Sequence, residues 1–278
     1  MSYTIQKETT FQRVRRVFVQ SLNGEEQDYT TGSIDRAIVL LAIPMILEMA
    51  MESLFAVVDA FFVAKIGVEA VATVGLTESM LMLVYSIAIG LSAAATAMVA
   101  RRIGEGDRDA AAKAGAQVIL IAVILSGVIA VPGYFYAEDL LRLMAHDTSV
   151  SETGFHFTRL LLTANLPILL LWMLNGIFRG AGDAATAMRA LWIANGVNII
   201  LCPVLIFGWG PFPAMGVIGS GVATTIGRSS GVAYQLWHLF EVGKIIRLRW
   251  NMLKPKWDTI GTLIKIASGS TGQYLISS

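Results

Sequence analysis

The chain has 278 residues, of which 55% are hydrophobic and 15% are charged, and its formal net charge is +1. Soluble domains carry about 25% charged residues, so this composition excludes a soluble globule, and its high apolar content excludes a disordered chain. The net charge gives no electrostatic basis for binding nucleic acid, and a single cysteine, Cys202, excludes a disulfide framework.

The N-terminal segment, residues 1–33, is polar and lacks the apolar core of a cleaved signal peptide. Apolar residues from Phe11 to Leu22 recur at helical spacing, with arginines between them. This pattern leaves two interpretations open. One is a short helix on the cytoplasmic membrane surface, and the other is a partly ordered cytoplasmic tail.

Six apolar stretches follow, each long enough to cross a hydrocarbon core of about 30 Å as a helix. They occupy residues 37–64, 72–100, 114–136, 155–178, 188–209 and 214–240. A seventh stretch begins near Asp258 and is still apolar at the last residue. The sequence therefore predicts an all-α polytopic membrane protein. Gly227 and Gly231, in the sixth stretch, predict close helix packing.

Lysines and arginines are distributed unevenly between the loops. The N-terminal tail and the loops after spans two, four and six hold 16 of them, against 3 in the other loops, while Arg228 and Lys265 lie within spans. The excess marks the cytoplasmic side, which predicts a cytoplasmic N-terminus. The expected location is the plasma (inner) membrane, as a multi-pass protein.

The start of span one, Ile34–Pro44, and the segment Asp258–Ser268 have similar polarity at an offset of 224 residues. The similarity suggests a duplicated six-helix unit whose second copy has only begun. The predicted organisation is therefore a cytoplasmic tail, a six-helix lobe, a basic cytoplasmic linker and the truncated start of a second lobe. These units occupy residues 1–33, 34–240, 241–257 and 258–278.

Span one carries three carboxylates, Glu48, Glu52 and Asp59. Glu52 and Asp59 lie about 40° and about 20° around the helix from Glu48, so all three share one face along roughly 16 Å. Burying a carboxylate at membrane depth costs about 3 kcal/mol, which favours a polar cavity or an ion path here. For Glu48 and Glu52, pairing with arginines or backbone groups is an equally open explanation. Pro44, one turn earlier, is a candidate hinge. Glu78 is explained by interfacial placement near the start of span two.

Asparagines occur in two later spans, Asn165 and Asn175 in span four and Asn195 and Asn198 in span five. Cys202 lies one turn after Asn198 on the same face. Amide oxygens can coordinate a cation or accept a hydrogen bond from a protonated acid. For each asparagine taken alone, hydrogen bonding between helices is the default alternative.

The sequence contains no enzyme signature. Ser220 and His238 lie on one helix about 27 Å apart, beyond the reach of a catalytic pair. No group of residues has the spacing of metal ligands, and we expect no resident cofactor.

Four segments together resemble the multidrug and toxic compound extrusion (MATE) family of transporters. The first contains Pro44, the run Val57-Val-Asp-Ala-Phe-Phe-Val-Ala-Lys-Ile-Gly67 and the residues up to Leu76. The others are two loops, Val99–Asp107 and Phe178–Asp183, and the segment Gly216–Thr224 of span six. The ordered combination is specific, and the resemblance runs from about residue 34 to the end.

The resemblance implies twelve helices in two six-helix lobes, with substrate leaving through a central cleft as protons or sodium ions enter. Asp59 would be the coupling carboxylate of the N-terminal lobe, Asn198 matches the asparagine of the span-five cation site, and Asn175 matches the span-four asparagine. Cys202 departs from the pattern, because many relatives carry an aspartate there. Glu48 or Glu52 would then supply the missing charge.

On this resemblance the predicted function is a cation-coupled antiporter, driven by H⁺ or Na⁺, that exports drugs or other organic cations by alternating access. Its partners would be the lipid bilayer and a small cationic, amphiphilic substrate. One alternative is a flippase or exporter of lipid-linked or amphiphilic molecules from a related superfamily. Another is a non-transporting membrane scaffold. We expect this chain, which lacks the second lobe, to enter the membrane without catalysing coupled efflux.

Overall fold

The computed structural model describes residues 10–23, 33–145, 148–242 and 245–277, and these residues form helices and connecting turns without a strand. The predicted all-helical fold class is thereby confirmed. The α-helices are α1 (Thr10–Asn23), α2 (Ile34–Ala64), α3 (Val68–Gly104), α4 (Arg108–Met144), α5 (Thr148–Thr163), α6 (Leu166–Gly180), α7 (Ala184–Phe207), α8 (Val217–Trp237) and α9 (Trp257–Ser277). A π-helix, η1 (His238–Val242), extends α8, and a 3₁₀-helix, η2 (Trp250–Leu253), precedes α9.

The predicted spans fall on these helices. Within the described residues, α2, α3, α4 and α7 are long and apolar enough to cross a membrane, and α8 runs beside α7 without passing the same test. The predicted span 155–178 is broken into α5 and α6, which meet at a bend of 42°. Pro167 lies at the start of α6 and cannot donate a backbone hydrogen bond. Asn165 supports the bend by donating to the carbonyl of Leu162 at 2.6 Å.

Two of the loops that carry the family resemblance have the same local structure. Gly106 and Gly182 have φ angles of +77° and +84°, a left-handed conformation that favours glycine. The aspartate after each glycine caps the next helix. Asp107 accepts from the backbone N–H of Ala110 at 2.8 Å and begins α4, while Asp183 begins α7 in the same way. The repeated Gly-Asp pair therefore makes a tight turn between antiparallel helices.

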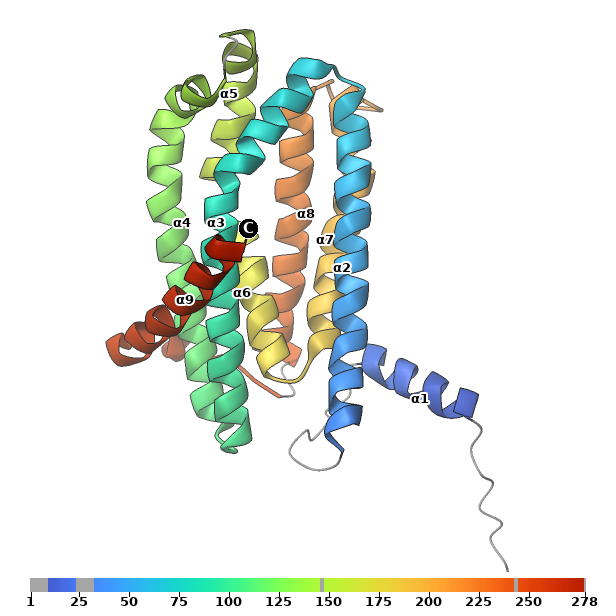
Figure 1. The fold of residues 1–278 in the computed structure, drawn as a ribbon, viewed down its shortest axis with the longest axis vertical. Helices are drawn as coiled ribbons and strands as arrows, with labels where there is room; N and C mark the ends of the chain where they lie inside the picture. The colour runs from blue at the N-terminus through green and yellow to red at the C-terminus, as the bar shows by residue number, and fades with distance from the viewer. Residues whose placement is uncertain (1–9, 24–32, 146–147, 243–244, 278) are drawn as a thin grey trace, which may run out of the picture.

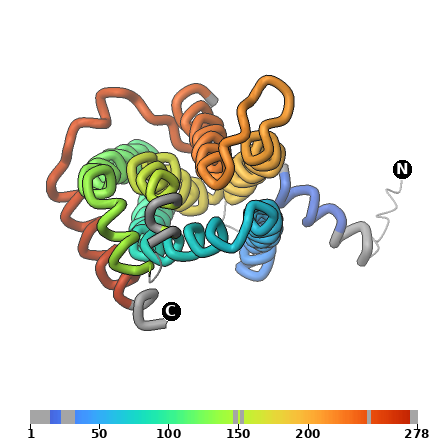
Figure 2. The backbone as a smooth tube through the Cα atoms, turned by 90° about the horizontal axis from the view of Figure 1, so that it is seen from above, coloured from blue at the N-terminus to red at the C-terminus, as the bar shows by residue number. Residues whose placement is uncertain are grey.

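The long helices run side by side, with α2, α7 and α8 on one side of the lobe and α3 and α4 on the other (Figure 1). Helix α1 projects sideways from the foot of α2, whereas α9 crosses α3 obliquely. Seen from above, α1 and α9 lie on different sides of the bundle (Figure 2). Helix α1 occupies the segment for which the sequence left a helix and a partly ordered tail open, while residues 1–9 and 24–32 lie outside the described residues. The predicted boundaries of the tail, lobe, linker and second-lobe start stay a prediction.

Close packing of α7 against α8 depends on glycine, as the sequence predicts. A Cβ atom at Gly227 would lie 2.5 Å from the carbonyl oxygen of Ala194, and one at Gly231 would lie 2.7 Å from that of Ala190. These distances are too short for any side chain, so the two backbones can approach only because hydrogen replaces Cβ. The approach brings polar side chains of α8 to the acidic face of α2.

Candidate functional site

The three carboxylates of α2 all find polar partners on neighbouring helices. Asn195 of α7 bonds Glu52 and Cys202 of α7 bonds Asp59, and each pair is separated by 143 residues in sequence. The equal separation means that α2 and α7 run parallel, with each acid level with its partner. Glu48, one turn before Glu52 in α2, is instead hydrogen-bonded by Asn175 of α6.

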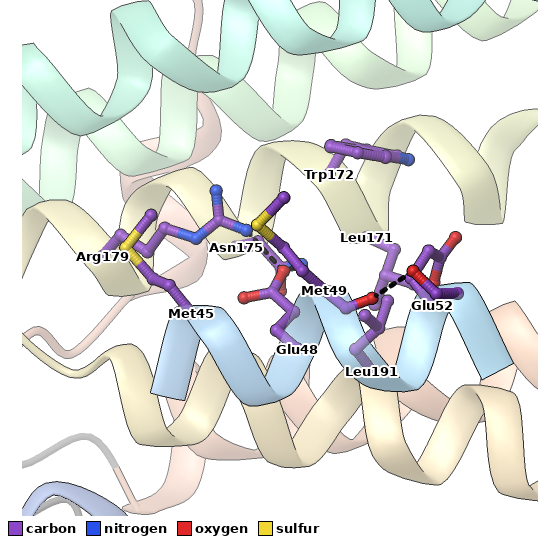
Figure 3. A pocket seen from close by; sticks show the side chains of 10 residues that line it. Met45, Glu48, Met49, Glu52, Leu171, Trp172, Asn175, Arg179 and Leu191 are labelled. Atoms are coloured by element: carbon purple, nitrogen blue, oxygen red, sulfur yellow. Dashed lines mark hydrogen bonds and ion pairs between the residues drawn. The ribbon is translucent and has the colours of Figure 1, made fainter. Parts of the chain in front are cut away.

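Glu48 is buried and belongs to a chain of hydrogen bonds that joins α2, α6 and α8. Its Oε1 accepts from Nη2 of Arg179 and, at 3.1 Å, from Nδ2 of Asn175 (Figure 3). Oδ1 of Asn175 accepts in turn from Nε2 of Gln235 at 2.5 Å. Gln235 thereby fixes which way the Asn175 amide points. Two residues predicted separately, Glu48 and Asn175, are therefore in direct contact, and Arg179, which was not predicted, joins them.

Glu52 forms a two-pronged ion pair with Arg228 of α8. Nη2 of Arg228 donates to Oε1 at 2.6 Å, Nη1 donates to Oε2 at 3.3 Å, and Asn195 donates to Oε2 at 2.9 Å. The guanidinium also lies 5.2 Å from the centre of the Phe55 ring. Glu48 and Glu52 are thus each paired with an arginine, which was one of the two explanations that the sequence left open for them.

Asp59 has a different environment. Its Oδ1 accepts from Oγ of Ser220 at 3.1 Å and from the Cys202 thiol at 3.4 Å. No basic side chain in the described part of the chain pairs with it. Of the three acids on this face, Asp59 alone is held only by neutral donors. Glu48 and Glu52, in contrast, each form an ion pair with an arginine.

Asn198 does not hydrogen-bond any of the three acids. Its Nδ2 donates to Oγ1 of Thr224 at 2.9 Å, and its buried Oδ1 has no hydrogen-bond partner. It lies on α7 between Asn195 and Cys202, which do contact acids. The predicted asparagine is thus near the site with a free acceptor oxygen. The contact to Glu52 comes from its neighbour one turn earlier.

Two cavities adjoin the acidic face. The Glu48 cavity, of about 380 Å³, is lined by Glu48, Glu52, Asn175 and Arg179 together with Met45, Met49 and Trp172 (Figure 3). The Asp59 cavity, of about 430 Å³, is lined among others by Glu52, Asp59, Glu78, Tyr85, Ser220 and Arg228. Glu52 and Trp172 border both cavities, whereas Arg228, the partner of Glu52, lines the Asp59 cavity alone. The sequence explains Glu78 by a position at the membrane interface and does not predict that it lines the Asp59 cavity.

Pro44 lies within α2, whose helical structure is continuous from Ile34 to Ala64. Its role as a hinge stays a prediction. In the part of the chain that the structure describes, no group of three or more histidines, cysteines, aspartates or glutamates could hold a metal ion.

The chain is similar to known transporters along most of its length. The family model described as MatE matches residues 44–204. A probable multidrug resistance protein NorM of Thermotoga maritima is 26% identical over 84% of this chain and 50% of the relative. An FAD transporter of Shewanella oneidensis is 30% identical over 70% of this chain and 43% of the relative.

Solved structures agree with these similarities. A MOP superfamily transporter from Pyrococcus furiosus superposes with a TM-score of 0.82 at 27% identity, covering 90% of this chain and 56% of the other. For that transporter, the reverse polarity of the binding pocket is reported to suggest a different function. An outward-facing multidrug resistance MATE family transporter superposes with a TM-score of 0.80 at 27% identity, covering 97% and 56%. The chain spans about half the length of the curated relatives it matches.

Proposed function

Because the chain belongs to the MatE family of transporters, we propose that it forms one lobe of an exporter of small molecules that exchanges its cargo for H⁺ or Na⁺. Drugs and other amphiphilic organic cations are the first candidate cargo, because relatives are named as multidrug resistance proteins. The transporter would work by alternating access between two lobes, of which this chain supplies the first.

The observation that carries the proposed coupling is the environment of Asp59. A partly buried carboxylate without a basic partner is favoured by taking up a proton or a cation. Uptake changes the hydrogen bonds that Asp59 accepts from Ser220 and Cys202, and so changes how α2 is held against α7 and α8. Ion binding then biases the lobe between two conformations. The free Oδ1 of Asn198 supports a part for this amide in holding the ion.

Glu48, Glu52 and Asn175 would serve the same cycle in another way. Two of them are neutralised by arginines, and Asn175 is fixed between Glu48 and Gln235. We propose that these groups set the register of α2 against its neighbours, while Asp59 exchanges the ion.

We propose that the chain is an integral part of the plasma membrane, and the distribution of basic residues supports placing its N-terminus inside. Arg101, Arg102 and Arg108 lie where α3 meets α4, and this turn is at the same end of the bundle as the start of α2 (Figure 1). We call it the basic end of the lobe. A cytoplasmic position for this end agrees with the positive-inside rule.

The proposed function is tested with the Asp59→Asn variant of the complete transporter in proteoliposomes. Uptake of a fluorescent cationic dye is measured while pH and sodium gradients are imposed separately. We expect the variant to fold and to lose gradient-driven transport, and the effective gradient to identify the ion. Glu78→Gln, which alters another acid of the same cavity, is the matched control. Gradient-driven transport by Asp59→Asn at the rate of the unaltered protein would refute the coupling role.

One observation favours a second class of cargo. Arg179 and Arg228 neutralise the acids that border the Glu48 cavity, so the charge of its lining does not select for cationic cargo alone. A relative named as an FAD transporter fits the same possibility. An uncharged or anionic amphiphile is therefore the second candidate. Competition between the dye and a flavin in the transport assay distinguishes the two classes.

A further inference from the structure

Helix α9 crosses α3 and α4 at an angle and leaves a groove of about 650 Å³ between them. The groove is lined mainly by apolar side chains, among them Ile124 and Val128 of α4 and Ile260 and Ile264 of α9. Ile124, Val128 and Ile264 are all exposed. The groove is open in the described part of the chain, and at membrane depth an open apolar groove is suited to lipid acyl chains.

A basic and aromatic segment lies directly before α9. Four exposed basic side chains occur in residues 245–256, namely Arg247, Arg249, Lys254 and Lys256. The exposed indole of Trp257 lines the groove itself, and Trp250 is equally exposed. Tryptophan favours the level of the lipid headgroups, where one part of the ring is apolar and the N–H is hydrated. The segment thus has the composition of a membrane interface, next to the groove.

Gln117 holds this segment in place. Its side chain is completely buried in α4, and Nε2 donates to the carbonyl oxygens of Met252 and Lys254 at 3.1 and 3.0 Å. Its Oε1 accepts from the backbone N–H of Lys256 at 2.8 Å. The backbone that carries Lys254 and Lys256 is therefore fixed, and their side chains remain exposed. Basic groups that are already positioned bind an anion at a lower entropic cost.

We propose that this groove binds an anionic phospholipid, with its acyl chains along α3, α4 and α9 and its phosphate beside Lys254 and Lys256. Acyl chains are as apolar as the groove, so the groove alone would not select one phospholipid over another. Selection comes from the exposed basic side chains on this fixed backbone, which attract a negative headgroup. The bound lipid would contact both the lobe and α9. This inference does not depend on the proposed transport function.

The headgroup is tested on the purified chain in detergent by native mass spectrometry. Phosphatidylglycerol and phosphatidylcholine with identical acyl chains are titrated separately. We expect phosphatidylglycerol to bind more tightly. One basic side chain at an anionic surface is worth about a fivefold change in binding, so Lys254→Gln/Lys256→Gln should reduce the preference by up to about 25-fold. Arg15→Gln/Arg16→Gln removes the same charge from α1, which lies on a different side of the bundle. This control should leave the preference for phosphatidylglycerol unchanged.

Equal affinity of the unaltered chain for the two lipids would overturn the proposal, as would an equal loss of preference in the two double variants. The groove is tested with Ile124→Trp, which fills it and should weaken binding of both lipids. Val131→Trp is the matched control, because Val131 lies two turns further along α4, is 62% exposed against 54% for Ile124, and is outside the groove. If the two tryptophan variants bind lipid equally, the lipid does not lie in the groove. Circular dichroism verifies that each variant is folded.

Discussion

Replacing Arg228 with methionine removes the arginine that neutralises Glu52 and leaves the Asn195 amide as a neutral donor. The opposite change, Glu52→Gln, leaves the guanidinium without its carboxylate. Removing one partner of a buried ion pair costs about 3–5 kcal/mol, because the remaining charge is neither paired nor hydrated. The two single variants are not equivalent, however, because the partners differ in exposure.

The side chain of Arg228 is 10% exposed and that of Glu52 is 34% exposed, on a cavity that can admit water. An unpaired Glu52 can therefore be partly hydrated and still accepts from Asn195. In Glu52→Gln the mostly buried Arg228 faces a neutral amide in place of its carboxylate, beside the Phe55 ring and in a cavity that Glu78 also lines. We expect Arg228→Met to destabilise the lobe by about 2–3 kcal/mol and Glu52→Gln by about 3–5 kcal/mol. The double variant, which buries no unpaired charge, should lie within about 2 kcal/mol of the unaltered chain.

Equilibrium unfolding of the four proteins in mixed micelles, followed by circular dichroism, gives the three differences in free energy of unfolding. The single changes sum to about 5–8 kcal/mol and the double variant should cost no more than about 2 kcal/mol, so the expected interaction energy between the two positions is about 3 kcal/mol or more. If the two single changes add to within about 0.5 kcal/mol in the double variant, the pair does not act as a unit and the reasoning is refuted.

Two further predictions concern Asp59 and the packing of α8. Infrared difference spectra of the chain in nanodiscs should contain a carboxylic-acid carbonyl band that titrates with pH and disappears in Asp59→Asn; if the band persists, another acid takes up the proton. Gly227→Ala should destabilise the lobe by about 1–3 kcal/mol, because its Cβ would meet a backbone oxygen at 2.5 Å. Gly196→Ala, where no atom lies within 4 Å of the added Cβ, should be neutral or stabilising by up to about 1 kcal/mol in the same unfolding measurement.

The acidic face of α2 could be predicted from the sequence because helical geometry alone fixes the angles between Glu48, Glu52 and Asp59. Their partners could not be predicted in this way. From the sequence alone, Arg179 is one of the basic residues near a loop that indicate topology, and Arg228 is a basic residue within a span. Each is more than 120 residues from the acid it pairs with. Such contacts depend on how α6 and α8 pack against α2, which no local pattern encodes.

The asparagines illustrate the same limit on a smaller scale. Asn195 and Asn198 differ by three residues on α7, so both could reach α2 by helical periodicity. The register of the two helices decides between them: Asn195 is level with Glu52, whereas Asn198 turns toward Thr224. The broken fourth span was also detectable only in part, because Pro167 signals an interruption but not the 42° bend.

The order of contacts along α2 bears on where this helix can bend. The two ion pairs of Glu48 and Glu52 lie between Pro44 and Asp59. A bend at Pro44 that moved the acids away from α6 and α8 would break both pairs, at about 3–5 kcal/mol each. Releasing Asp59 alone breaks two hydrogen bonds from neutral donors, at about 1 kcal/mol each. An ion at Asp59 should therefore move the part of α2 that follows Glu52. A hinge at Pro44 would instead move the segment before Glu48 and leave the three acids in place.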